Sequence, residues 1–98
     1  MKISMEKAAE IFKALSCTTR LKIVVGLIEK NECNVSKMVE GLNIAQPNVS
    51  QHLAILKNVG IIEGFRKGNQ ICYKVTDEFV VKIIEDMKKP FISQEVHF

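Results

Sequence analysis

A change in the spacing of apolar residues at Gly60 limits most strongly what this chain can fold into. Before that glycine the apolar residues recur at the spacing of one helical face, and Pro47 suits the first turn of such a helix. After it the spacing changes to two, and Gly68-Asn69 divides the alternating stretch as a two-residue hairpin turn does. The sequence therefore predicts a helix ended by a left-handed Gly60 and a β-hairpin that continues to about Val75. The apolar face of that helix consists of Val49, Leu53 and Leu56.

Three further helices are predicted before this unit. The first covers residues 5–15, where apolar residues have helical spacing and Ser4 can serve as a cap. The second begins at Thr18 or Thr19 and is apolar on most sides, so we expect it to lie centrally. After a break, Asn34 is a suitable cap for a short third helix.

A last helix follows the hairpin. An acidic turn at residues 76–78 complements its dipole, Pro90 is expected to end it, and residues 91–98 are expected to form a loose tail. Four helices, a hairpin and a final helix make the order α-α-α-α-β-β-α. That order predicts a winged helix-turn-helix, mainly α within the α+β class, in one domain spanning residues 1–98.

The composition is that of one small domain. Ninety-eight residues, of which 47% are hydrophobic, suffice for a compact core and leave apolar surface for a partner. No apolar run has the length of a membrane span, and the first residues lack the features of a signal peptide, so we expect a cytoplasmic location. The net charge of +3 is weakly basic, and the grouping of cations matters more than their sum. Cations in or near the helix–hairpin unit are Lys57, Arg66, Lys67 and Lys74.

The polar residues of the helix before Gly60 suit contact with double-stranded DNA. Amide, hydroxyl and imidazole groups can hydrogen-bond to base edges and phosphates in the major groove. An ordinary solvated helix face is the alternative, and the adjoining hairpin favours DNA contact. The candidate groove-facing residues are Gln46, Asn48, Ser50, Gln51 and His52.

The tip of the hairpin is a second candidate contact, to phosphate or the minor groove. Any hairpin tip is polar, so each residue there has a solvated alternative. Lys57 is either a backbone contact or a solvated lysine, and Arg20 is expected to be structural instead of DNA-facing. The candidate residues at the tip are Arg66, Lys67, Asn69 and Gln70.

Three segments together resemble the ArsR/SmtB family of bacterial and archaeal transcriptional repressors. They are Leu15-Ser-Cys-Thr-Thr-Arg-Leu-Lys-Ile-Val, Ile44-Ala-Gln-Pro-Asn-Val-Ser-Gln-His-Leu-Ala-Ile-Leu and Val59-Gly-Ile-Ile-Glu. The resemblance covers roughly residues 5–88, and its Gln-Pro-x-Val-Ser-x-His-Leu core is fairly specific within winged-helix proteins. It implies a homodimer joined through its first and last helices on a near-palindromic operator. It also implies that an inducer, often a metal ion, or oxidation of thiols releases that operator.

One residue departs from the family pattern. The family commonly has serine or threonine at the position of Ala45, where it caps the helix, and alanine forgoes about 1 kcal/mol of capping. Asn43 or water is the expected substitute.

The apolar stripes Met5–Leu15 and Phe79–Met87 favour the dimer independently, because they exceed what one small core needs. The alternative is that both stripes close the core of the monomer. A dimer would place two recognition helices about one turn of DNA, roughly 34 Å, apart.

The family's metal sites do not match this chain. The site at the start of the third helix needs two or three cysteines within Glu-Leu-Cys-Val-Cys-Asp, whereas residues 32–37 read Glu-Cys-Asn-Val-Ser-Lys. One thiol cannot build a soft-metal site. The site on the last helix pairs Asp-x-His with two later ligands, whereas Phe79 stands two residues after Asp77 and only His97 lies downstream. We therefore expect no metal and no cofactor.

The three cysteines stand apart, so reduced thiols are expected. Cys17 precedes the second helix, where a helix dipole favours a thiolate, and is the candidate redox-sensing residue. Cys33 is expected in an exposed turn, and Cys72 on the hairpin beneath Phe65. For each thiol a packed or incidental role is the competing interpretation. The inducer is left open, and a repressor without a ligand is an alternative.

The sequence thus predicts a homodimeric, sequence-specific DNA-binding regulator that lacks the family's metal sites. The resemblance implies that it is a repressor, and a response to thiol oxidation is left open. The alternative is a winged-helix module that contacts a protein through the same helix face. An enzyme is not expected, because His52 and His97 are far apart in sequence and no nucleophile motif, phosphate loop or carboxylate pair stands out.

Overall fold

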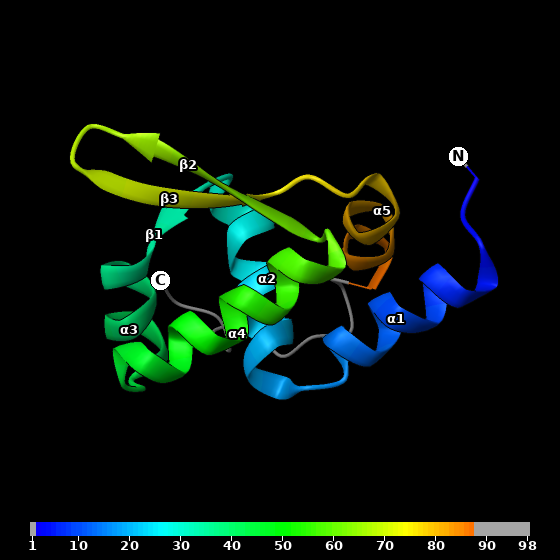
Figure 1. The fold of residues 1–98 in the computed structure, drawn as a ribbon, viewed down its shortest axis with the longest axis horizontal. Helices are drawn as coiled ribbons and strands as arrows, with labels where there is room; N and C mark the ends of the chain where they lie inside the picture. Colours follow the sequence, from blue (N-terminus) through cyan, green and yellow to red (C-terminus); the bar gives the residue numbers. More distant parts are fainter. Residues whose placement is uncertain (1, 88–98) are drawn as a thin grey trace.

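Five helices and three strands, which form one small sheet, make up residues 2–87, the part of the chain that the computed structural model describes (Figure 1). The predicted winged helix-turn-helix is confirmed. The predicted helix end at Pro90 and the tail over residues 91–98 lie outside the described residues. The elements are α1 (Met5–Leu15), α2 (Thr18–Lys30), β1 (Cys33–Asn34), α3 (Val35–Leu42), α4 (Gln46–Val59), β2 (Ile62–Lys67), β3 (Gln70–Val75) and α5 (Glu78–Met87).

The sheet contains one strand that the sequence analysis did not predict. β1 pairs antiparallel with β3, with Cys33 opposite Tyr73 and Asn34 opposite Cys72, so that the strand order is β1-β3-β2. Cys33 is 4% exposed and belongs to the core, so its expected place in an exposed turn is wrong. Two residues are too few for an alternating pattern to show, which is why the strand was missed.

The ends of the helices follow their capping residues. Ser4 Oγ accepts a hydrogen bond from Lys7 N at 3.0 Å, and Asn34 Oδ1 accepts one from Lys37 N at 2.9 Å, as expected of N-caps. Gly60 has a φ of +90° and ends α4 in the left-handed region, as predicted. Local chemistry therefore fixes the starts of α1 and α3 and the end of α4.

The hairpin turn is also as predicted. β2 and β3 pair from Ile62 opposite Val75 to Lys67 opposite Gln70, and Gly68 has a φ of +63° between them. A left-handed residue at this point matches the twist of the two strands. The β2–β3 hairpin, called the wing below, extends away from the helices in Figure 1.

Only part of each terminal apolar stripe enters the core. On α1, Ile11 is fully buried, whereas Met5 is 85% and Phe12 51% exposed. On α5, Ile84 is 1% exposed and Met87 is 45% exposed. The core is therefore closed by one side of each stripe, and the other side remains uncovered in the monomer.

The elements divide the molecule into two ends. In Figure 1 the tip of the wing and α3 lie at one end, α1 and α5 lie at the other, and α4 crosses between them. None of the helices within residues 2–87 is long and apolar enough to cross a bilayer.

Candidate nucleic-acid interface

Helix α4 has one buried and one exposed side. Val49 and Leu56 are fully buried and Leu53 is 2% exposed, which fixes the rotation of the helix against the core. Four of the predicted contact residues are exposed on the remaining surface and are called the α4 outer face below. They are Gln46, Asn48, Ser50 and Gln51.

The first turn of α4 is open to a ligand. Ala45 is its N-cap and, among the described residues, no side chain hydrogen-bonds to this end of the helix. Asn43, the expected substitute, instead ends α3 with a φ of +57°. Residues 41–62 contain no aspartate or glutamate. The free N–H groups and the positive end of the helix dipole can therefore face a phosphate, and no carboxylate on this stretch of the chain competes for them.

His52 differs from the α4 outer face in its surroundings. It is half-buried, and its Nδ1 lies 3.2 Å from Nη1 of Arg20 on α2. Because arginine only donates hydrogen bonds, Nδ1 is the acceptor and the ring proton sits on Nε2. Burial, and secondly the Arg20 charge, lower the pKa of His52 below 6.5. A DNA contact by His52 stays a prediction, whereas its contact with α2 is part of the fold.

Arg20 has the structural role that the sequence analysis expected. Its Nε donates to the carbonyl oxygen of Ala14 at 2.7 Å, while Nη1 reaches His52. One half-buried guanidinium thus joins the end of α1 to the middle of α4.

The four candidate residues at the tip of the wing are all exposed, but two of them already have protein partners. Lys67 donates a hydrogen bond to Glu32 and forms an ion pair with it. The hydrogen bond, and secondly the Glu32 charge, raise the pKa of Lys67. Gln70 Oε1 accepts a hydrogen bond from Asn34 Nδ2 at 2.5 Å. Arg66 and Asn69 make no side-chain hydrogen bond or ion pair within residues 2–87, so they remain available.

Glu32 and Asn34 are therefore functional candidates that the sequence analysis missed. Glu32 immediately precedes β1 and Asn34 is its second residue, and both hold the tip of the wing to the start of α3. Glu32 and Asn34 reach the wing because β1 pairs with β3. No pattern in the sequence predicted β1. Lys57, by contrast, is exposed on the last turns of α4, where either predicted role is open to it.

The thiols differ in accessibility. Cys17 is half-exposed at the N-cap of α2, whereas Cys33 and Cys72 are 4% and 5% exposed. Burial is the main cause that raises the pKa of the Cys33 thiol. Within the described part of the chain, no three histidine, cysteine, aspartate or glutamate side chains are grouped to hold a metal ion.

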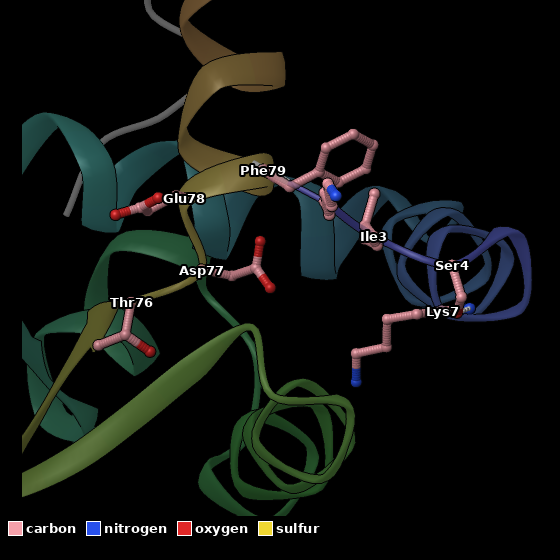
Figure 2. A pocket seen from close by; sticks show the side chains of 8 residues that line it. Ile3, Ser4, Lys7, Thr76, Asp77, Glu78 and Phe79 are labelled. Atoms are coloured by element: carbon pink, nitrogen blue, oxygen red, sulfur yellow. Dashed lines mark hydrogen bonds between the residues drawn. The ribbon is translucent and has the colours of Figure 1, made fainter.

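A hollow of about 490 Å³ lies between the segment before α1 and the start of α5 (Figure 2). Lys7 and Asp77 provide charged groups in its lining, and both have roles in the fold. Lys7 Nζ donates to the carbonyl oxygen of Val59, and Asp77 Oδ1 accepts from Val80 N at 3.0 Å, capping α5. The hollow therefore offers no unpaired buried group to a ligand and belongs to the α1/α5 end of the molecule.

Comparison with known proteins agrees with this geometry. Residues 17–63 match the model of the arsR family of bacterial regulatory proteins. The HTH-type transcriptional repressor SmtB of Mycobacterium tuberculosis is 38% identical over 82 residues, which cover 84% of this chain and 60% of that protein. The chain thus spans less than two thirds of that relative's length.

In two further comparisons the match covers most of this chain and most of the related protein. An uncharacterized HTH-type transcriptional regulator of Methanocaldococcus jannaschii is 42% identical over 82% of this chain and 90% of its own. The crystal structure of the transcriptional repressor BigR from Xylella fastidiosa has a TM-score of 0.80 at 31% identity, covering 91% of this chain and 90% of that one. These relatives are regulators and not enzymes. The chain belongs to the arsR family of bacterial regulatory proteins.

Proposed function

We propose that this chain is a homodimeric, sequence-specific DNA-binding protein that represses transcription from a near-palindromic operator. The observation that carries the proposal is the α4 outer face. It presents amide and hydroxyl groups on a helix whose rotation is fixed by a buried stripe, and its open first turn has no neighbouring carboxylate in the sequence. Such a surface suits a polyanion whose bases are read through hydrogen bonds.

Each part of the surface has a definite role in this proposal. Gln46, Asn48 and Gln51 are suited to base edges, since amides pair with adenine in the major groove, and Ser50 suits a base or a phosphate. The uncapped start of α4 binds a phosphate. At the wing, Arg66 and the Asn69 amide reach phosphate or the minor groove. Lys57, Lys67, Gln70 and His52 remain secondary candidates, because Lys67, Gln70 and His52 already have protein partners.

The uncovered sides of α1 and α5 support the dimer. Met5, Phe12 and Met87 are large apolar side chains that the monomer leaves exposed, and the Phe12 ring meets the Phe79 ring edge-on with 6.0 Å between centroids. Contact between two such surfaces about a twofold axis removes this apolar area from water. The same axis places the two recognition helices about one DNA turn, roughly 34 Å, apart.

The relatives named above support repression as the direction of control, because SmtB and BigR are both described as repressors. We place the protein in the cytoplasm, with the DNA it binds. Cys17 is the thiol that an oxidant reaches most readily, since the other two are buried. Any response to oxidation should therefore disappear in Cys17→Ser.

Selection of bound duplexes from a random pool, with reduced and with oxidised protein, tests the proposal. We expect an inverted pair of half-sites whose centres lie about 10 base pairs apart. Replacing Ser50 and Gln51 together by alanine should abolish the preference for the operator while the dimer and its melting temperature are retained. Lys82→Ala, at an exposed position on α5, is the matched control. Retained specificity in the double variant, or a micromolar monomer with no duplex preference, contradicts the proposal.

Salt separates this function from that of a protein-binding module. A dimer that makes about six phosphate contacts loses about 10³-fold in affinity between roughly 50 and 200 mM salt. A protein partner on the α4 outer face would show a much weaker dependence, because that face itself carries no charge.

A further inference from the structure

Two polar contacts join the helix that carries the exposed apolar surface to the helix that faces DNA. Near the start of α1, Lys7 Nζ donates to the carbonyl oxygen of Val59, the last residue of α4. Figure 2 shows this side chain directed toward the end of α4. Near the end of α1, the Ala14 carbonyl oxygen accepts a hydrogen bond from Nε of Arg20 on α2, and Nη1 of Arg20 contacts His52 on α4. Helix α1 is thus fastened to α4 at both of its ends.

We propose that Arg20 is a positioning residue that sets the angle between α1 and α4, and thereby the spacing of the two recognition helices in the dimer. The inference rests on the proposed homodimer. Its dimer surface lies on α1 and α5 and its reading surface on α4, so the geometry between α1 and α4 affects which half-site spacing fits. The Ala14–Arg20–His52 bridge crosses that junction.

The chemistry of the bridge requires an arginine. Nε and Nη1 are two donors of one rigid plane, and they bind acceptors on two different helices, at 2.7 Å and 3.2 Å. The single nitrogen of lysine could not hold both acceptors in a fixed geometry. Arg20 is also half-buried, so water screens these contacts less than it would on the open surface.

The bridge also requires a neutral His52. Protonation would turn the Nδ1 acceptor into a donor and set two cations side by side. Helices α1, α2 and α3 and strand β2 all pack against α4, and Arg20 on α2 is the one charge among the described residues that shifts the pKa of His52. Within residues 2–87 no carboxylate offsets that charge at His52, so acid should weaken the bridge.

Acid therefore distinguishes the bridge from a direct DNA contact by His52. A histidine that touches phosphate binds it more strongly when protonated, so operator affinity would rise as the pH falls. If His52 acts through Arg20, affinity falls instead. The two roles predict opposite signs over the same pH range.

The experiment uses the full chain with His97→Gln as the parent, so that His52 is the one remaining histidine. Arg20→Met and His52→Gln are made in that parent, with Lys22→Met as a control that removes a cation from the same helix. Within residues 2–87, Lys22 takes part in no side-chain hydrogen bond. Circular dichroism and sedimentation first establish that each variant folds and dimerises. Operator affinity is then measured from about pH 5.5 to 7.5 and on operators with one base pair added to or removed from the spacer.

The parent should lose affinity as the pH falls below 6.5, the ordinary pKa of histidine, and His52→Gln should show no such change. The parent should prefer its own spacer by about tenfold, the effect of one hydrogen bond to a charged group. Arg20→Met should largely lose that preference while still binding a single half-site, and Lys22→Met should keep it. If Arg20→Met does not fold, Arg20→Lys replaces it. This variant keeps the charge and one donor, and it too should largely lose the spacer preference.

Affinity that rises in acid, an unchanged pH profile in His52→Gln, or a retained spacer preference in both Arg20 variants overturns the proposal. If the His97→Gln parent binds no duplex, the proposed function is wrong, and the bridge is not tested by DNA binding. The bridge then still has its own readout, the NMR titration of the His52 ring without DNA. Arg20→Met should raise the pKa of His52 toward 6.5, and an unchanged titration means that no bridge exists in solution.

Discussion

Asn34 makes two hydrogen bonds with one amide, and its replacement by alanine removes both. Its Oδ1 caps α3 by accepting from Lys37 N, and its Nδ2 donates to Gln70 on the wing. Loss of an N-cap costs about 1 kcal/mol, and loss of an exposed neutral hydrogen bond costs about 0.5 kcal/mol. We therefore expect Asn34→Ala to lower the free energy of unfolding by about 1.5 kcal/mol, which lowers the melting temperature by about 6–9 °C in a domain of this size.

Two companion variants separate the contributions at this residue. Asn34→Asp keeps the oxygen that caps α3 and adds a negative charge at a helix N-terminus, so it should remain within about 0.5 kcal/mol of the parent. Ser4→Ala removes a cap whose hydrogen bond, from Lys7 N, stays within the first turn of α1, and it should cost about 1 kcal/mol.

Urea unfolding followed by circular dichroism at several protein concentrations measures these differences, because a dimer unfolds with concentration dependence. An Asn34→Asp variant as unstable as Asn34→Ala would contradict the prediction, since the cap would then not be the main contribution. The prediction is also refuted if Asn34→Ala costs less than Ser4→Ala, since the bond to the wing would then contribute nothing.

Three more predictions concern the start of α4, the dimer and metals. Ala45→Ser should supply the missing cap and raise the free energy of unfolding by about 1 kcal/mol, and a loss of stability on urea unfolding would contradict the open first turn. Phe12→Ser should raise the dimer dissociation constant by about 10³-fold, because each protomer loses about 2 kcal/mol of ring burial. Sedimentation measures the dissociation constant, and Lys13→Ser, at an exposed position on the same helix, is the control. Zinc, cadmium or arsenite should leave operator affinity unchanged, and tight stoichiometric binding would show that the ligand count is wrong.

Local patterns were sufficient for most of the fold. Ser4, Asn34 and Gly60 mark helix ends through their own side chain or backbone, and the Gly68-Asn69 turn fixes the hairpin register. These features involve residues a few positions apart, so they can be recognised without knowing the fold. The contact between β1 and β3 depends on residues far apart in the chain, and two residues give no periodic signal.

The contact of His52 with α2 was missed for a different reason. His52 lies three residues after Val49 and four before Leu56, which is the spacing of the buried face. Its polarity led to its assignment with the outward residues, although its position already indicated contact with the core. The partner, Arg20, could not be named from sequence, because it comes from another helix.

The pairing of β1 with β3 also bears on how the molecule assembles. Asn34 and Gln70 lie 36 residues apart, and the helices between them can form from local contacts before the two ends meet. Closing so long a loop costs entropy that only the completed sheet offsets. We therefore expect the wing to be the last element to reach its native position during folding, and its amides to exchange with deuterium before those of α2 and α4.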